Sequence, residues 1–151
     1  MKSFLLLFIC CSVYGKTGAQ REEKDTGPRQ IIGRLQSAGI TKSSLEYSKS
    51  GTDTSYYLFI KDASEHPKNN YFSILFKNTD GALDKLYGSL KSFFLEENRK
   101  KKNYTRSFRL GNKSVSVQYH LLITGRGIRF STEDGYTYWS EKDIDKLFGK
   151  D

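Results

Sequence analysis

The two histidines are the residues best suited to chemistry in this chain. Two histidines and a lysine can cleave a phosphodiester by general acid–base catalysis. His66, however, precedes a proline in a polar stretch, His120 lies in a predicted strand, and no pattern in the sequence brings them together. The sequence therefore favours a protein without catalytic residues. A small secreted hydrolase or nuclease that uses His120 with a nearby arginine or lysine is the alternative.

Motifs of nucleophilic, phosphate-binding and metal chemistry are missing from the sequence. The chain has no Gly-x-Ser-x-Gly elbow, no Gly-x-x-x-x-Gly-Lys loop and no His-Glu-x-x-His pair. Its acidic residues do not have the spacing of a calcium-binding loop. We therefore expect neither a metal nor a cofactor.

A row of polar side chains on one face of the predicted sheet is a candidate ligand-binding surface. Hydroxyl, amide, imidazole and guanidinium groups on a rigid sheet can recognise a carboxylate or a sugar. An ordinary solvated sheet face is the alternative. The candidate residues are Ser116, Gln118, His120, Arg129 and Arg109, with Thr105 and Ser107 on the same face.

The densest positive cluster is a candidate contact for a polyanion or an anionic membrane surface. It consists of Arg99, Lys100, Lys101 and Lys102. Cations at the end of a helix also neutralise the negative end of the helix dipole, so a helix C-terminus explains the cluster without any partner, and the sequence favours that explanation. Because the aromatic residues do not alternate with these cations, the sequence argues against nucleic acid as the partner.

The first nineteen residues have the pattern of a secretory signal peptide. Lys2 precedes an apolar run over residues 4–11, and small residues follow, with Ala19 as the predicted end and Gly15 as the alternative. The run is too short to span a bilayer, so we expect no transmembrane segment after cleavage. Ile9 precedes Cys10, which argues against a lipoprotein. We expect a secreted or periplasmic protein.

The mature chain is predicted to be basic and free of cysteine. Both cysteines lie in the predicted signal peptide, and losing Lys2 and Lys16 leaves 23 basic against 17 acidic residues. The remainder is long enough for one hydrophobic core. We predict a flexible lead-in over 20–27 and a single domain over 28–151. Asn103 and Asn112 begin N-glycosylation sequons, whose use depends on the source of the chain.

The first half of the domain is predicted to contain two helices and three strands. Apolar spacing predicts helices over 28–38 and 80–98, with Asn78, Thr79 or Asp80 capping the second. A hairpin with a Gly51-Thr52 turn would place Leu45 opposite Leu58. Its second strand is apolar on both faces, since it also carries Tyr57 and Phe59, and this predicts cover on both sides. A third strand is expected over 71–77.

The second half is predicted to be a four-stranded meander and a final helix. Turns at Gly111-Asn112, Gly125-Arg126 and Asp134-Gly135 would place Phe108 opposite Val115, Tyr104 opposite Tyr119 and Ile123 opposite Ile128. The same registers pair Leu121 with Phe130, His120 with Ser131 and Leu122 with Arg129. Ser140 and Asp143 predict a capped helix that ends at Gly149.

These elements predict an α+β fold in the order αβββ-αββββ-α, with one mostly antiparallel, twisted sheet of six or seven strands. The helix over 80–98 would pack on one face of it, with Leu86, Leu90 and Phe93 against Val117, Tyr119 and Leu121. The function that this sequence favours is an exported, small, basic, non-enzymatic binding domain. Its partner would be a protein or an anionic ligand, and a peripheral membrane contact through residues 99–102 is the second alternative.

Overall fold

The computed structural model describes residues 27–65, 67, 70–101 and 103–150. The predicted signal peptide, nearly all of the predicted lead-in, His66 and Lys102 lie outside the described residues. Among the described residues, no helix is long and apolar enough to cross a membrane.

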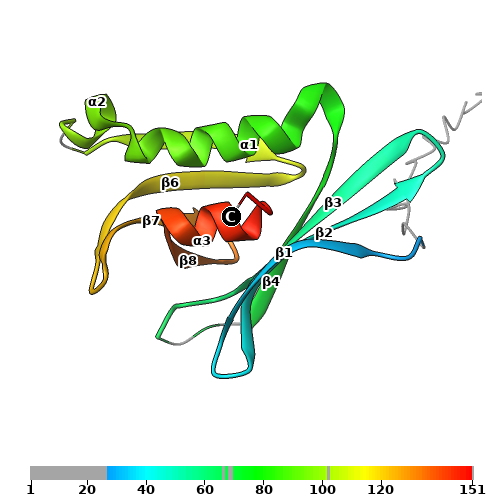
Figure 1. The fold of residues 1–151 in the computed structure, drawn as a ribbon, viewed down its shortest axis with the longest axis horizontal. Coiled ribbons are helices and arrows are strands. Elements are labelled where there is room, and N and C mark those ends of the chain that lie inside the picture. Colours follow the sequence, from blue (N-terminus) through cyan, green and yellow to red (C-terminus); the bar gives the residue numbers. More distant parts are fainter. Residues whose placement is uncertain (1–26, 66, 68–69, 102, 151) are drawn as a thin grey trace, which may run out of the picture.

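Two four-stranded antiparallel sheets make up most of the domain (Figure 1). Sheet A contains β1 (Gln30–Ser37), β2 (Ile40–Ser50), β3 (Asp53–Lys61) and β4 (Tyr71–Lys77), and sheet B contains β5 (Thr105–Leu110), β6 (Lys113–Leu122), β7 (Gly125–Thr132) and β8 (Gly135–Ser140). In each sheet the strands are neighbours in chain order. The helical elements are η1 (Thr79–Gly81), α1 (Ala82–Lys91), η2 (Ser92–Phe94), α2 (Glu96–Arg99) and α3 (Glu141–Leu147).

The α+β class is confirmed, but the prediction of a single sheet is wrong. The strands do not continue from β4 to β5, because the β5–β6 turn packs against the backbone of β4 instead. A Cβ atom on Gly111, in that turn, would lie 2.0 Å from the carbonyl oxygen of Leu75 in β4. The second half of the chain therefore meets sheet A with a turn rather than with a strand edge.

The segment predicted as a helix over 28–38 is strand β1. Its register with β2 shifts between Ile31 and Gly33 and again between Leu35 and Gln36. Such bulges interrupt the alternation of inward and outward side chains. They leave apolar residues at spacings of three and four that imitate a helix, and the helix prediction is wrong for that reason.

The remaining strands of sheet A agree with the sequence. Leu45 pairs with Leu58, as predicted for the hairpin. Strand β4 begins and ends at the predicted residues, and β3 lies between β2 and β4. The inner faces of the two sheets are joined by Trp139 of β8, whose Nε1 donates a hydrogen bond to Oγ of Ser43 at 3.1 Å.

The predicted helix over 80–98 is broken into shorter pieces. It starts after Gly81, which has a positive φ of 70°, and no side chain caps it, so the predicted capping residues are wrong. The extended backbone of Leu95 separates η2 from α2. Leu86, Leu90 and Phe93 are buried as predicted. Figure 1 shows α1 lying along sheet B.

The register of the meander is confirmed for its first hairpin and wrong for its second. Phe108 pairs with Val115, as predicted. Strand β7 starts at Gly125, and Tyr119 rather than Ile123 faces Ile128. Leu121 pairs with Arg126 beyond the end of the core, where 80% of it is exposed, so its placement in the predicted core is wrong.

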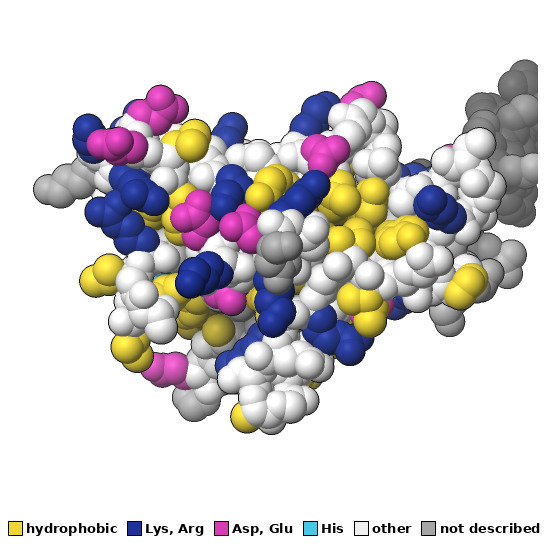
Figure 2. Space-filling model, in the orientation of Figure 1, with side chains coloured by type: hydrophobic (Ala, Val, Ile, Leu, Met, Phe, Trp, Pro, Cys, Tyr) yellow, Lys and Arg dark blue, Asp and Glu magenta, His cyan; other side chains and the backbone are white. Residues whose placement is uncertain are grey.

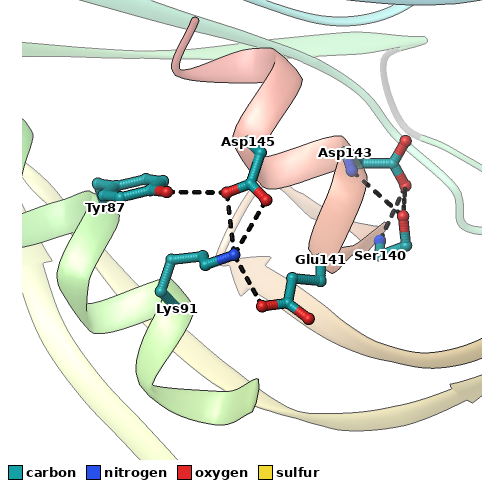
Figure 3. Close-up of polar contacts among 6 residues, drawn as sticks. All are labelled: Tyr87, Lys91, Ser140, Glu141, Asp143 and Asp145. Carbon is teal, nitrogen blue, oxygen red and sulfur yellow. Dashed lines mark hydrogen bonds and ion pairs between the residues drawn. The ribbon is translucent and has the colours of Figure 1, made fainter. Parts of the chain in front are cut away.

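Helix α3 closes the core and connects the two halves of the chain. Its capping box of Ser140 and Asp143 is present as predicted. Figure 3 shows the polar clamp between α1 and α3, in which Lys91 Nζ donates to Glu141 at 2.7 Å and to Asp145 at 3.0 Å. Burial lowers the pKa of Lys91, but these carboxylates outweigh it and raise the pKa overall. The clamp therefore fixes α3 against α1.

Candidate ligand-binding surfaces

The predicted polar row lies on one face of sheet B, here called the outer face of sheet B. Gln118 pairs with Arg129, and Ser116 pairs with Ser131. Arg109 lies on β5, where its guanidinium donates to the carbonyl oxygen of Asn112 at 3.3 Å. His120 pairs with Gly127, not with Ser131, and Arg129 does not pair with Leu122. Because the register error is an even number of residues, the side chains remain on the same face.

Two tyrosines of β8 complete this face, and the sequence analysis overlooked them. The Arg129 guanidinium lies 3.9 Å from the ring centre of Tyr136, and the His120 ring stacks on Tyr138 at 4.2 Å. The Nε atom of Arg129 is buried without a hydrogen-bond partner among the described residues. The alternation of Tyr136 and Tyr138 in the sequence is the feature that could have revealed them. Among the described residues, no ion pair joins His120 to a carboxylate.

A second surface lies where α2 ends beside the β6–β7 turn. Arg99, Lys100 and Lys101 are exposed there, as expected, and Lys102 is outside the described residues. A hollow of about 270 Å³ is lined by Arg99, Tyr119, His120, Leu121 and Arg126. The end of α2 and the β6–β7 hairpin therefore form one continuous surface.

Apolar side chains project from the same end of the molecule. Leu121 is 80% exposed and Ile123 is fully exposed at the tip of the β6–β7 hairpin. Figure 2 shows apolar side chains at this end, at the left of the view, below a group of basic ones. We call the set of Arg99, Lys100, Lys101, Leu121, Ile123 and Arg126 the basic tip.

A half-buried tyrosine, whose hydroxyl is fully buried, lies beneath the basic tip. The Tyr119 hydroxyl is buried and has no hydrogen-bond partner among the described residues. Burial raises its pKa, and the charges of Arg99 and Arg126 act in the opposite direction. The ammonium of Lys101 lies 5.5 Å from the ring centre of Tyr104, and the ring centres of Tyr104 and Tyr119 are 6.4 Å apart. The three cations are thus gathered around one aromatic cluster.

The third surface is a trough on the outer face of sheet A, which the sequence analysis did not predict. It measures about 750 Å³ and is lined by Arg29, Arg34, Thr41, Ser44, Glu46, Tyr57, Phe59, Ser73, Leu75, Asn112 and Lys113. The apolar second face of β3 was expected to be covered. Phe59 is instead 37% exposed and Leu75 is 42% exposed. The two apolar faces of β3 were visible in the sequence, but only the fold shows that one of them is open.

Comparison with known proteins identifies no relative of this chain. No protein family, no curated protein and no solved structure matches it. Among the described residues, no group of three or more His, Cys, Asp or Glu side chains is placed to hold a metal ion.

Proposed function

We propose that this chain is an exported, non-catalytic binding domain that docks onto an anionic lipid surface through the basic tip. The observation that carries the proposal is the exposure of Leu121 and Ile123 beside a group of cations. Export is part of the proposal and rests on the pattern of residues 1–19.

The exposed leucine and isoleucine favour a lipid surface over a soluble polyanion. Burying a leucine or isoleucine side chain contributes about 1.5–3 kcal/mol, and two such side chains at a hairpin tip can enter the interfacial region of a bilayer together. Nucleic acid and acidic glycans offer no apolar phase for them. The apolar tip therefore adds a selectivity that the cations alone do not have.

The cations supply the electrostatic part of the binding. Each basic side chain near an anionic leaflet contributes about 1 kcal/mol. Lys100 is paired with Glu96 at 3.4 Å, so it contributes less than the others. Arg99, Lys101 and Arg126 have no ion pair within the described part of the chain. Their combined contribution of about 3 kcal/mol adds to that of Leu121 and Ile123 and makes the binding sensitive to salt.

Co-sedimentation with vesicles tests this function. The purified protein is mixed with vesicles of phosphatidylcholine, with and without phosphatidylserine, at low and high salt. We expect binding that rises with phosphatidylserine and falls with salt. Leu121→Ser combined with Ile123→Ser should lose most binding to both kinds of vesicle. Arg99→Gln combined with Arg126→Gln should lose only the part that depends on phosphatidylserine.

Matched controls come from the opposite sheet. Ile40→Ser removes an exposed apolar side chain, and Lys42→Gln removes an exposed cation, both at the start of β2. Neither should change vesicle binding. Equal binding by the Leu121/Ile123 variant and the unchanged protein would refute the membrane proposal. If the protein does not bind vesicles, and the Leu121/Ile123 variant is retained on heparin as strongly as the unchanged protein, the partner is a soluble polyanion instead.

A further inference from the structure

The floor of the trough on sheet A is an exposed apolar surface on a central strand. In β3, Tyr57 pairs with Leu75 of β4 and Phe59 pairs with Ser73 of β4, and all four side chains lie on the same face. Ile31 of β1 is 51% exposed beside them. The Phe59 ring also stacks on Tyr71 at 4.8 Å. Apolar and aromatic side chains exposed next to one another can pack against apolar side chains of a partner.

Positive charge is concentrated at the β1 edge of the trough. The Arg29 guanidinium lies 3.8 Å from the ring centre of Tyr57, and Arg34 lies nearby on β1. Neither arginine has an ion pair within the described ranges. An arginine held flat on an aromatic ring presents its edge to a carboxylate with little loss of side-chain freedom.

The other charged side chains of the trough form no ion pair with these arginines among the described residues. Glu46 lies on the floor and accepts a hydrogen bond from Ser44 Oγ at 3.0 Å. Lys113, at the far rim, is bound to Glu133 at 3.1 Å and to Asp134 at 2.7 Å, so its charge is already compensated. The trough therefore has a cationic β1 edge, a floor of apolar side chains with the single carboxylate Glu46, and a nearly neutral far rim.

The dimensions of the trough fit a short extended chain. Its lining crosses all four strands, from Arg34 on β1, with Arg29 just before that strand, to Leu75 on β4. Three spacings of about 4.8 Å between strands give about 14 Å, which an extended peptide covers with about four residues. The small hydroxyl groups of Thr41 and Ser73 and the amide of Asn112 lie in reach of peptide groups along this path.

We propose that this trough binds an extended peptide segment of a partner protein, with an Asp, Glu or C-terminal carboxylate at the β1 edge and apolar side chains on the floor. Arg29 and Arg34 would hold the carboxylate through charge-assisted hydrogen bonds. Tyr57, Phe59 and Leu75 would contact the apolar side chains. The exposed aliphatic Leu75 and Ile31 favour a peptide over an acidic sugar. The trough shares no residue with the basic tip, so peptide binding and membrane binding can be tested independently of each other.

Selection from a display library of random short peptides tests the proposal. The purified protein should enrich sequences that combine an acidic residue with aromatic or aliphatic residues. An enriched peptide, synthesised with a fluorescent label, is then titrated and followed by its anisotropy. Arg29→Glu combined with Arg34→Glu should weaken binding about tenfold or more, because the carboxylate then meets like charge. Leu75→Ser should also weaken binding, because the floor then loses an apolar contact with the peptide.

Two variants on other surfaces serve as controls. Lys85→Glu reverses an exposed cation on α1, and Ile40→Ser removes an exposed apolar side chain; both residues lie outside the trough lining. Both should bind the labelled peptide as the unchanged protein does, and all of these exposed variants should keep its melting temperature. The proposal is overturned if no acidic sequence is enriched, or if the controls weaken binding as much as the trough variants. Binding of a uronic acid oligosaccharide without any peptide binding would also overturn it.

Discussion

Replacement of Gly33 by alanine should destabilise the protein, because β1 and α3 touch backbone to backbone at this residue. A Cβ atom built on Gly33 would lie 2.2 Å from the carbonyl oxygen of Lys146 and 2.4 Å from that of Leu147. An ordinary contact needs at least 3.4 Å, so α3 would have to move about 1.2 Å from β1. Insertion of extra volume into a packed core costs about 1–3 kcal/mol. For a domain of this size, that lowers the melting temperature by about 4–12 °C.

Gly88→Ala is the matched control, with an effect of the opposite sign. Gly88 lies inside α1, and a Cβ atom there would meet nothing within 4 Å. Because alanine favours the helix, this variant should gain about 0.5–1 kcal/mol. Thermal melting and urea titration of both variants measure the difference. A Gly33→Ala protein that melts with the unchanged protein would show that α3 does not press on β1, and it would refute this description of the core.

Two other predictions concern single polar residues. Asp62 accepts hydrogen bonds from Ser64 and from the backbone N–H of Tyr136, and although burial raises its pKa, these bonds lower it overall. The stabilisation by Asp62 should therefore be complete above the unfolded pKa of about 4 and disappear as the pH falls through the lower folded pKa. Asp62→Asn should thus cost less stability below about pH 4 than above it, and urea titration at several pH values measures this difference. If the outer face of sheet B binds a carboxylate ligand, His120→Ala and Arg129→Ala should each abolish binding of that ligand, measured by calorimetry. The exposed His120 should then change stability by less than about 0.5 kcal/mol, whereas Arg129→Ala also removes the contact with Tyr136 and should cost more. A large loss of stability in His120→Ala would make that residue structural.

Local turn chemistry and alternation predicted much of the sheet structure. The β2–β3 and β5–β6 hairpins are correct because a two-residue turn fixes the register of both strands. The capping box of α3 is correct because Ser140 and Asp143 act within one helical turn. These features depend on residues close together in the chain, and the sequence contains all the information they need.

The errors occur where distant contacts decide the local structure. Gly33 in the middle of a supposed helix was evidence against that helix, and its real role is to let α3 approach, which only the fold shows. The turn before β7 was placed two residues late, because Gly125 and Gly127 both resemble turn residues. Gly127 is needed within the strand instead, since a Cβ atom there would lie 2.4 Å from Leu122 and 2.8 Å from the carbonyl oxygen of Trp139.

Of the candidate surfaces, the one that depends on local alternation was predicted, and those that depend on distant contacts were not. Alternation along β6 and β7 correctly placed Gln118, His120 and Arg129 on one face. Because side chains alternate between the two faces with a period of two, a register error of an even number of residues does not change the face. The trough on sheet A depends on which sheet face remains uncovered, and no local pattern contains that information. The exposed hairpin tip was hidden by the register error that placed Leu121 in the core.

The chain order of the two sheets determines how the domain can fold. Each sheet consists of strands that pair with their neighbours in sequence, so each can assemble rapidly from local hairpins. The core is completed only by α3, whose contact with β1 joins residues more than one hundred positions apart. Helix α3 follows both sheets in chain order, so a nascent chain has both sheets before it has the helix that packs against β1. Deletion of the last ten residues should therefore leave a chain that forms its hairpins but does not reach a cooperative native state.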